Sequence, residues 1–173
     1  MLRRCHTAEL TSTELAEVRA LLEVAFGGFD DHDWSHALGG MHALVLEDDA
    51  LVAHGALVMR RLLHEGRSLP CGYVEAVAVH PDAQRRGLGS MVMASLEELA
   101  PAYDVLALSA SARGALLYES RGWSLWRGDS SVVTVSGLEP TPEDDGSIWV
   151  LPGRTTLDLD APIACDWRDG DVW

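Results

Sequence analysis

The stretch that decides the fold is residues 72–97, GYVEAVAVHPDAQRRGLGSMVMASLE. Its first part, residues 73–79, is rich in Val and Ala and predicts a β-strand, whereas the residue spacing after Gly89 predicts a helix. Between them lies the glycine loop, Gln84-Arg85-Arg86-Gly87-Leu88-Gly89. Glycines allow the backbone to approach a ligand closely, and the free N–H groups at a helix start attract anions. The stretch therefore predicts a site for a phosphate or pyrophosphate group.

Two other phosphate-binding motifs are excluded. A P-loop needs the lysine of G-x-x-x-x-G-K-[ST], but all 13 Lys+Arg residues of this chain are arginine. The dinucleotide fingerprint G-x-G-x-x-G does not match Gln84-x-x-Gly87-x-Gly89, and no second βαβ unit of suitable pattern follows.

Length and composition predict one globular domain over residues 1–173, because a chain of this size is too short for two comfortable domains. No apolar run reaches the roughly 18 residues of a membrane span, and no signal-peptide segment follows Met1, so we expect a cytoplasmic protein without membrane contact. Cys5, Cys71 and Cys165 are scattered and odd in number, which is typical of reduced thiols and predicts neither a disulfide framework nor a metal site.

The formal net charge of −14 is the strongest compositional signal. It excludes nucleic-acid partners, which need basic surfaces, and favours cationic ligands, since a negative cleft speeds the association of polycations. The alternative is that the acidic surface only provides solubility.

The order of expected elements predicts an α/β (α+β) domain with a mixed, mostly antiparallel sheet flanked by helices. A helix is expected to begin at the capping box Thr11-Ser12-Thr13-Glu14 and to end at Gly27-Gly28. Further helices are expected before Gly39-Gly40 and over residues 89–100 and 112–121, and strands over residues 3–7, 42–47, 51–63, 73–79, 105–109, 123–126, 132–136 and 148–151. Loops are expected over residues 29–34 and 139–146, and an irregular tail over residues 152–173.

The glycine loop, in its setting of strand and helix, resembles the Q/R-x-x-G-x-G/A signature of the GCN5-related N-acetyltransferases (GNAT superfamily). The resemblance implies the GNAT fold and a loop that binds the pyrophosphate of acetyl-coenzyme A, the co-substrate, with no metal. It also implies that backbone groups of the preceding strand bind the pantetheine arm and the thioester oxygen. The residues implied in coenzyme binding are Val77, Ala78, Val79, Gln84, Arg85, Arg86, Gly87, Leu88 and Gly89.

Two residues are the candidates for proton transfer. Glu75 is a carboxylate in an otherwise apolar strand, where propensity alone least predicts one, and we expect it to act as general base through a water molecule. Tyr118 lies in a segment, residues 115–123, that resembles the A-x-x-L-Y-x-x-x-G-[FW] helix of the same superfamily, which implies that its hydroxyl protonates the leaving thiolate. The structural alternatives are a solvent-facing Glu75 and a Tyr118 that only packs in the core.

Four blocks spread along the chain resemble the aminoglycoside 2'-N-acetyltransferases: residues 33–44, 60–62, 71–75 and 165–173. The resemblance implies acetylation of the 2'-amine of a cationic aminoglycoside, and an antibiotic-resistance role. The residues that it implies in acceptor binding are Asp33, Glu75, Ala76, Ser109, Glu143, Asp144, Asp171 and Trp173, the last through a free carboxylate. For each acidic residue of this set, the alternative is a solvated charge in a loop that contacts no ligand.

Two departures from this family concern the substrate range: Ala76 stands where Gly is frequent, and Gly27-Gly28-Phe29 replaces a segment that often carries an acidic residue. Two other functions stay open on the sequence. One is a GNAT enzyme that acetylates another small polyamine or a protein N-terminus, and the other is a non-catalytic module that binds aminoglycosides or acetyl-coenzyme A. Family members are often dimers, which implies a homodimer here.

Overall fold

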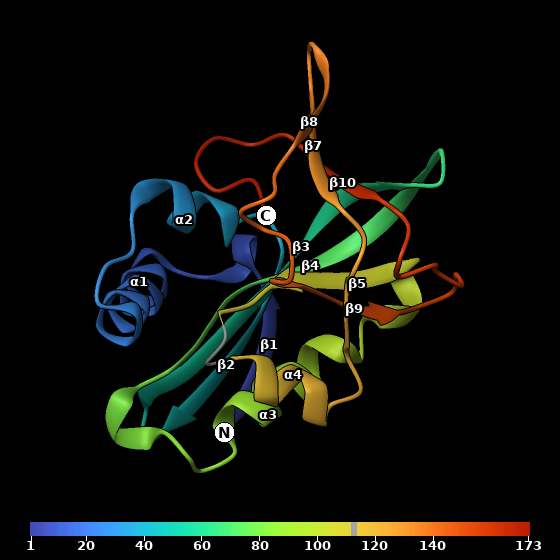
Figure 1. The fold of residues 1–173 in the computed structure, drawn as a ribbon. Helices are drawn as coiled ribbons and strands as arrows, with labels where there is room; N and C mark the ends of the chain where they lie inside the picture. Colours follow the sequence, from blue (N-terminus) through green and yellow to red (C-terminus); the bar gives the residue numbers. More distant parts are fainter. Residues whose placement is uncertain (112–113) are drawn as a thin grey trace. The chain divides into compact units, whose positions relative to one another are not determined.

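The computed structural model describes residues 1–111 and 114–173. The chain divides into two compact units, of which unit 1 comprises Met1–Val58 and Val74–Leu99, and unit 2 comprises Met59–Tyr73 and Ala100–Trp173. The strands β3 (Ala50–His64) and β4 (Arg67–Val79) are neighbours in the sheet, and each contributes residues to both units. The helices and most of the strands are labelled in Figure 1. The expectation of a single domain over residues 1–173 stays a prediction.

Unit 1 contains the N-terminal elements and the glycine loop. Apart from its parts of β3 and β4, its elements are β1 (Leu2–His6), the 3₁₀ turn Thr7–Glu9, α1 (Ser12–Phe26), α2 (Asp31–His36), β2 (Met41–Glu47), the 3₁₀ turn Pro81–Ala83 and α3 (Leu88–Glu97). β2 pairs antiparallel with both β1 and β3. Asp48 and Asp49, both with positive φ, form the turn of the β2–β3 hairpin.

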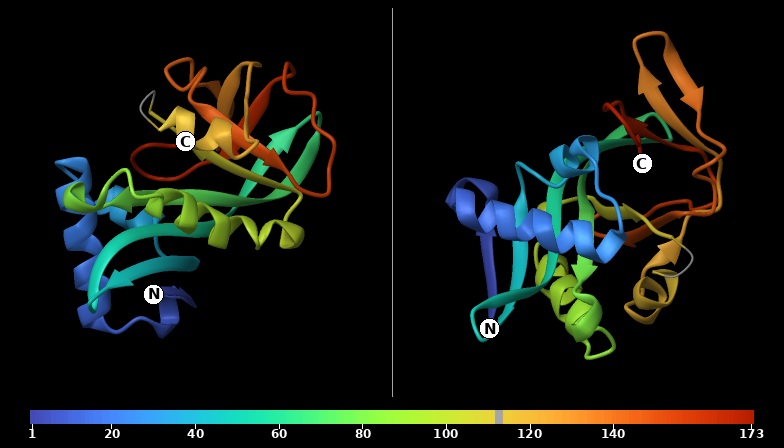
Figure 2. Two further views of the ribbon diagram at one scale, coloured as in Figure 1. Left: turned by 90° about the horizontal axis from the view of Figure 1, so that it is seen from below. Right: turned by 90° about the vertical axis from the view of Figure 1, so that its left-hand side faces the viewer.

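The capping box predicted for α1 is confirmed. The Thr11 side chain accepts a hydrogen bond from the Glu14 N–H, and Glu14 Oε2 accepts one from the Thr11 N–H. The helix ends at Gly27, whose φ of +72° is the left-handed conformation that glycine adopts without strain. Val18 and Leu22 on α1 pack with Leu44 on β2 into the core of unit 1, and Figure 2 shows α1 lying alongside β1 and β2.

Helix α3 approaches the sheet closely at Gly55 on β3. A Cβ at this position would lie 2.6 Å from a Val92 methyl carbon, so the absence of a side chain permits the contact. The helix contributes Val92, Met93 and Leu96 to the buried interior. The glycine loop, which leads directly into α3, is thereby joined to a well-packed helix.

Unit 2 is built from short strands added to its parts of β3 and β4. Its further elements are the 3₁₀ turn Ala100–Ala102, β5 (Val105–Ser109), α4 (Ala115–Ser120), β6 (Ser124–Leu125), β7 (Ser130–Thr134), β8 (Gly137–Pro140), β9 (Ile148–Pro152) and β10 (Ile163–Asp166). β5 pairs parallel with β4 and antiparallel with β9, which also pairs with β6. β10 pairs antiparallel with β3 and parallel with β7, and β7 forms a hairpin with β8. The sheet is therefore mixed, as expected.

Three expectations were wrong. Residues 31–34, expected in a loop, belong to α2, because Asp30 and Asp33 form a capping box. Residues 139 and 140, expected in the loop 139–146, form the end of β8 because they pair with β7. The tail is not wholly irregular, because β10 is inserted between β3 and β7. Of the helix expected over residues 112–121, residues 112 and 113 lie outside the described part.

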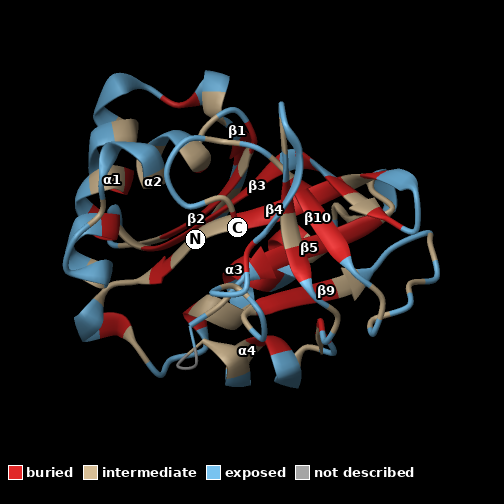
Figure 3. Cartoon of the chain, turned by 45° about the horizontal axis from the view of Figure 1, so that its top comes forward, coloured by how far each residue is buried: buried red, intermediate tan, exposed pale blue. Residues whose placement is uncertain are grey.

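The strands supply most of the buried interior, whereas α1 and α2 carry much exposed surface (Figure 3). All three cysteines are buried free thiols, as expected, and burial raises the pKa of Cys165 to about 11. None of the helices in residues 1–111 and 114–173 has the length and apolar character that crossing a membrane requires.

Candidate functional site

The glycine loop of unit 1 has the backbone of an anion-binding turn. Gly87 is the N-cap of α3 with a φ of +79°, and it has no side chain that could cap the helix. Arg85 also has a positive φ, +60°. Since the first N–H groups of a helix have no partner within it, they are available to a ligand at this end of α3.

The side chains predicted to bind the coenzyme differ in what they can offer. Leu88 and Ala78 are buried, so only their backbone groups are available to a ligand. Gln84 Nε2 donates to the Val79 carbonyl oxygen at 3.4 Å, which ties the loop to the end of β4. Arg86 makes two hydrogen bonds with Glu47 at 3.0 and 2.8 Å, and Arg85 is exposed.

The backbone of β4 is irregular beside the candidate base. Glu75 is half-buried, and the following Ala76 has a φ of +53°, in the left-handed region that alanine adopts only at a cost. The register of β4 with β5 ends at the pair Tyr73–Ala107. From Val74 onward, the backbone groups of β4 are therefore not paired with β5.

Two buried histidines that sequence reasoning missed are linked to this irregular point. His54 Nδ1 lies 2.9 Å from the Ala76 carbonyl oxygen, and His54 Nε2 lies 2.9 Å from His42 Nδ1. The sequence held a signal, because residues 42 and 54 lie on the two strands of the expected hairpin, each in an otherwise apolar run. In the observed register His54 is opposite Leu44, so the two histidines are diagonal neighbours on one face.

Asp33, expected in an acidic loop, is instead the third residue of α2. Its Oδ2 accepts a hydrogen bond from the Asp30 N–H at 3.4 Å, and its own N–H donates to Asp30 Oδ1 at 2.9 Å. Its carboxylate therefore helps to cap the helix in addition to any contact with a ligand.

In unit 2 the structure brings together three of the predicted acceptor-binding carboxylates. Burial, followed by the nearby charges of Asp171 and Glu143, raises the pKa of Asp144 to about 6. Ser109 Oγ lies 3.0 Å from Ser147 Oγ, which donates at 2.7 Å to the Asp144 carbonyl oxygen. These contacts connect the end of β5 to an acidic group suited to a cation, which we call the acidic cluster (Glu143, Asp144 and Asp171).

The C-terminal segment is anchored within unit 2 through Trp173. Only 3% of Trp173 is exposed, and its indole N–H donates to Thr141 Oγ1 at 3.0 Å. Arg168 Nη2 donates to the Trp173 backbone oxygen at 3.0 Å, and Arg168 Nε donates to the Asp171 carbonyl oxygen at 2.7 Å. The Arg168 guanidinium therefore holds the backbone of residues 171–173 in place.

Two arginines flank the ring of Tyr73. The guanidinium carbons of Arg60 and Arg168 lie 4.8 and 5.5 Å from its centroid, within the range of cation–π attraction. Arg60 also donates to the side chain and to the backbone carbonyl of Asp166, at 2.9 and 2.7 Å. Three of the sequence blocks that resemble one enzyme family thus meet in one cluster.

Tyr118, the candidate acid, is a buried residue of α4. Its ring lies 6.0 Å from that of Trp123, and burial raises the pKa of the hydroxyl to about 12. The hydroxyl therefore holds its proton at neutral pH, as a proton donor must.

The predicted site residues fall into both units. Asp33, Glu75, Ala76 and the coenzyme-binding residues belong to unit 1, whereas Ser109, Tyr118, Glu143, Asp144, Asp171 and Trp173 belong to unit 2. The joint action of the two sets stays a prediction. In the part of the chain that the structure describes, no group of three or more His, Cys, Asp or Glu residues is arranged to hold a metal ion.

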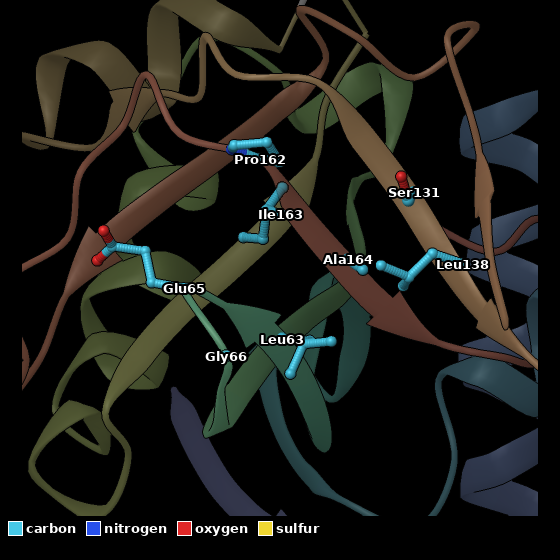
Figure 4. A pocket seen from close by; sticks show the side chains of 8 residues that line it. All are labelled: Leu63, Glu65, Gly66, Ser131, Leu138, Pro162, Ile163 and Ala164. Carbon is cyan, nitrogen blue, oxygen red and sulfur yellow. The ribbon is translucent and has the colours of Figure 1, made fainter.

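Two hollows of about 240 and 290 Å³ lie elsewhere on unit 2, among β3, β7 and β10. Figure 4 shows the first, in which Leu63 and Leu138 are among the lining side chains. Neither hollow contains a residue predicted for the site.

The comparisons with known proteins agree with these features. The acetyltransferase (GNAT) domain family matches residues 6–126. An aminoglycoside 2'-N-acetyltransferase from Mycolicibacterium fortuitum is 48% identical over 177 residues, which cover 99% of this chain and 91% of that protein.

Solved structures of low sequence identity share the fold. A GCN5-related N-acetyltransferase from Kribbella flavida superposes with a TM-score of 0.61 and 24% identity over 75% of this chain, which spans 34% of that protein. A GNAT family acetyltransferase from Brucella melitensis, solved in complex with acetyl-CoA, has a TM-score of 0.61 and 16% identity, with 95% of both chains covered. The predicted fold class is confirmed.

Proposed function

We propose that this chain, which belongs to the acetyltransferase (GNAT) family and within it to the aminoglycoside 2'-N-acetyltransferases, transfers the acetyl group of acetyl-coenzyme A to the 2'-amine of aminoglycosides. The observation that carries the proposal is the 48% identity over 99% of the chain with a protein named for that activity. The reaction needs a bound donor, a neutral amine, stabilisation of the developing oxyanion and a proton for the leaving thiolate.

The donor is proposed to bind at β4 and the glycine loop. The uncapped start of α3 and the left-handed Arg85 and Gly87 present backbone N–H groups suited to the pyrophosphate. Because Arg86 is engaged with Glu47, we expect its contribution to be mainly to the shape of the loop. The strand groups of Val77 and Val79 are proposed to bind the pantetheine arm.

Glu75 and Tyr118 are proposed to move the two protons. Glu75, through a water molecule, accepts the proton of the ammonium, so that the neutral nitrogen attacks the thioester carbonyl carbon. The C–N bond forms, the C–S bond breaks, and the thiolate takes the hydroxyl proton of Tyr118. The second proton lost by the nitrogen passes through water to Tyr118 and restores its hydroxyl, so that one proton in total is released through Glu75. Burial raises the pKa of Tyr118 to about 12, which keeps the hydroxyl protonated but makes it a weaker acid, so the proposed role is supported by the resemblance of its segment to the family helix and not by this shift. Correct placement of such a group contributes about 100 to 10,000-fold to the rate.

The acceptor is proposed to be a polycation held by carboxylates. The acidic cluster supports this, since burial and then the charges of Asp171 and Glu143 raise the pKa of Asp144, and a bound cation relieves the repulsion between these carboxylates. Asp33 and Ser109 are proposed as further contacts. Because the Trp173 backbone oxygen already accepts a hydrogen bond from Arg168, we expect it to contribute less than the acidic side chains.

The test is regiochemical. The protein is incubated with acetyl-coenzyme A and pairs of aminoglycosides that carry or lack a 2'-amine, and thiol release is followed together with mass spectrometry of the product. We expect turnover only of compounds with a 2'-amine. Equal turnover of both sets contradicts the regiochemistry, and binding without thiol release favours the non-catalytic module.

We further propose a homodimer in the cytoplasm, where acetyl-coenzyme A is available. Unit 2 exposes apolar side chains close to the two hollows, since Val133, Leu138 and Trp167 are 39%, 58% and 57% exposed and each lines one of them. A second copy that covered these side chains would remove an exposed apolar surface from water. Leu138→Asp with Val133→Asp should give a monomer by light scattering, whereas a monomeric wild-type protein contradicts the proposal.

A further inference from the structure

A continuous chain of hydrogen bonds leads through unit 1 to the backbone of β4. Thr7 Oγ1 lies 2.7 Å from His42 Nε2, His42 Nδ1 lies 2.9 Å from His54 Nε2, and His54 Nδ1 lies 2.9 Å from the Ala76 carbonyl oxygen. Both imidazoles are fully buried. The chain ends on the residue that follows Glu75, and the function proposed above assigns no role to either histidine.

The Ala76 carbonyl, at one end of this series of hydrogen bonds, fixes the tautomer of each ring. A carbonyl oxygen only accepts hydrogen bonds, so His54 Nδ1 must carry the hydrogen that faces Ala76. Burial lowers the pKa of both imidazoles, so each ring is neutral and has one N–H. His54 Nε2 is therefore an acceptor, and the hydrogen between the rings belongs to His42 Nδ1. His42 Nε2 in turn accepts a hydrogen bond.

The Thr7 hydroxyl, at the other end of the hydrogen-bond chain, donates the hydrogen bond that His42 Nε2 accepts. The Thr7 hydroxyl has a second acceptor, the Gly40 carbonyl oxygen at 3.1 Å, but this oxygen already receives the Thr7 backbone N–H at 2.9 Å. Donation to His42 Nε2, the shorter contact, satisfies both groups. The Gly39 N–H donates to Thr7 Oγ1 at 2.9 Å and so orients the hydroxyl. All hydrogens of the chain are thus directed toward Ala76.

The peptide that receives the last hydrogen bond is unusual. Ala76 has a φ of +53°, which is unfavourable for a residue with a Cβ, so a specific interaction is needed to hold it. In a trans peptide the C=O and the following N–H point in opposite directions, and the described residues contain no cis bond. With the Ala76 carbonyl turned toward His54, the N–H of Val77 is directed away from His54.

We infer that His54 is a positioning residue, whose Nδ1–H holds the Ala76–Val77 peptide so that the Val77 N–H is aimed at the thioester oxygen of bound acetyl-coenzyme A. The Ala76 carbonyl selects this tautomer of His54, and His42 and Thr7 stabilise it by directing a hydrogen bond to His54 Nε2. The inference rests on the proposed function, in which β4 binds the thioester. A donor fixed before the reaction stabilises the developing oxyanion without reorganisation, so the effect belongs to the chemical step.

Two amide variants of His54 separate positioning from packing. His54→Asn places an N–H near the position of Nδ1, whereas His54→Gln places it near Nε2 and leaves the Ala76 carbonyl without its donor. We expect His54→Asn to keep kcat within about threefold and His54→Gln to lower it about 10 to 100-fold with an unchanged KM for acetyl-coenzyme A, because the interaction strengthens only in the transition state. Equal kcat values per folded molecule in both variants would overturn the inference.

Thr7, at the other end of the hydrogen-bond chain, gives a milder test that leaves the two buried histidines unchanged. Thr7→Ser keeps the hydroxyl, and Thr7→Val removes it with little change of volume. Nitrogen-15 NMR of the wild-type imidazoles should show hydrogen on Nδ1 and none on Nε2 in both rings. In Thr7→Val we expect a mixture of tautomers at His42 and a lower kcat, and in Thr7→Ser neither change. A wild-type His54 with hydrogen on Nε2 contradicts the inference.

A titration without any acceptor distinguishes this inference from the substrate assignment. The Val77 amide resonance should shift with acetyl-coenzyme A and much less with coenzyme A, which lacks the acetyl oxygen. In His54→Gln the difference should vanish while the calorimetric affinity for coenzyme A stays the same. If wild-type protein acetylates no aminoglycoside but shows this difference, the substrate proposal fails and the positioning role stands. A Val77 amide that responds to both ligands alike overturns the positioning role.

Discussion

At the scale of single residues, the backbone of Ala76 is strained, and this is the position at which the family resemblance implies glycine. A φ of +53° is a conformation that glycine adopts readily and alanine adopts at a cost of about 1–2 kcal/mol. The glycine that the family resemblance implies at this position would adopt this conformation without strain. The methyl group of Ala76 packs against the core cluster of unit 1, which offsets part of the cost.

We expect Ala76→Gly to raise the free energy of unfolding by up to about 1 kcal/mol, because the relief of strain exceeds the entropy that glycine adds to the unfolded chain. Ala76→Val should lower it by about 2 kcal/mol, because a β-branched residue is least tolerated in the left-handed region. Urea denaturation measures both. The matched control is Ala78→Gly, two residues along the same strand, which should lower the stability by at least about 1 kcal/mol. A loss in Ala76→Gly equal to that of the control contradicts the argument.

The acidic cluster predicts a pH dependence with a defined sign. The pKa of Asp144 in the folded protein, about 6, lies above its ordinary value of 3.8, so the folded state binds the proton more tightly than the unfolded state. Its contribution to stability is therefore present at low pH and is lost as the pH rises through about 4 to 6. Thermal melts of wild type and Asp144→Asn should diverge over this window, with the variant relatively more stable at high pH. Glu143→Gln should weaken the dependence, and parallel curves contradict it.

At the scale of elements, the reliable predictions were those with a local signal. The Thr11–Glu14 capping box and Gly27 gave α1 both of its ends, and the Val-rich run gave β4. β10 has four residues, and its strand conformation depends on pairing with β3 and β7, which are remote in sequence. α2 carried a signal in the Asp30-x-x-Asp33 pattern, although Asp33 was expected in a ligand-binding loop.

The tail has packing contacts in addition to its predicted role. Its binding of the acceptor stays a prediction, while Trp173 is buried and hydrogen-bonded to Thr141. We expect Trp173→Ala to lower the free energy of unfolding by about 3–5 kcal/mol through the cavity it leaves. Trp173→Phe keeps most of the packing and should cost about 1 kcal/mol for the lost hydrogen bond. Chemical denaturation measures both, and unchanged stability in Trp173→Ala would contradict the packing role.

At the scale of the whole molecule, the sequence predicted the fold class more completely than the contacts between distant segments. The family blocks 60–62, 71–75 and 165–173 were recognised separately, and the structure shows why they occur together, because Arg60, Tyr73, Asp166 and Arg168 are in contact. No local pattern encodes such contacts between distant segments. The buried His42–His54 pair was missed for the same reason, because the hydrogen bond between the two rings depends on how the two strands pair.

The net charge of −14 leaves two explanations, steering of a cationic acceptor or solubility alone, and ionic strength separates them. Raising the salt from about 0.01 M to about 0.1 M shortens the Debye length from about 30 Å to about 10 Å. If charge steers a polycationic aminoglycoside, kcat/KM for it should fall at least about tenfold, with kcat unchanged.

The variant Glu143→Gln with Asp171→Asn should show a smaller salt effect than wild type. The matched control, Glu17→Gln with Glu119→Gln, removes the same charge from exposed positions outside the acidic cluster and should keep the wild-type salt effect. Equal salt effects in both double variants would assign the acidic composition to solubility.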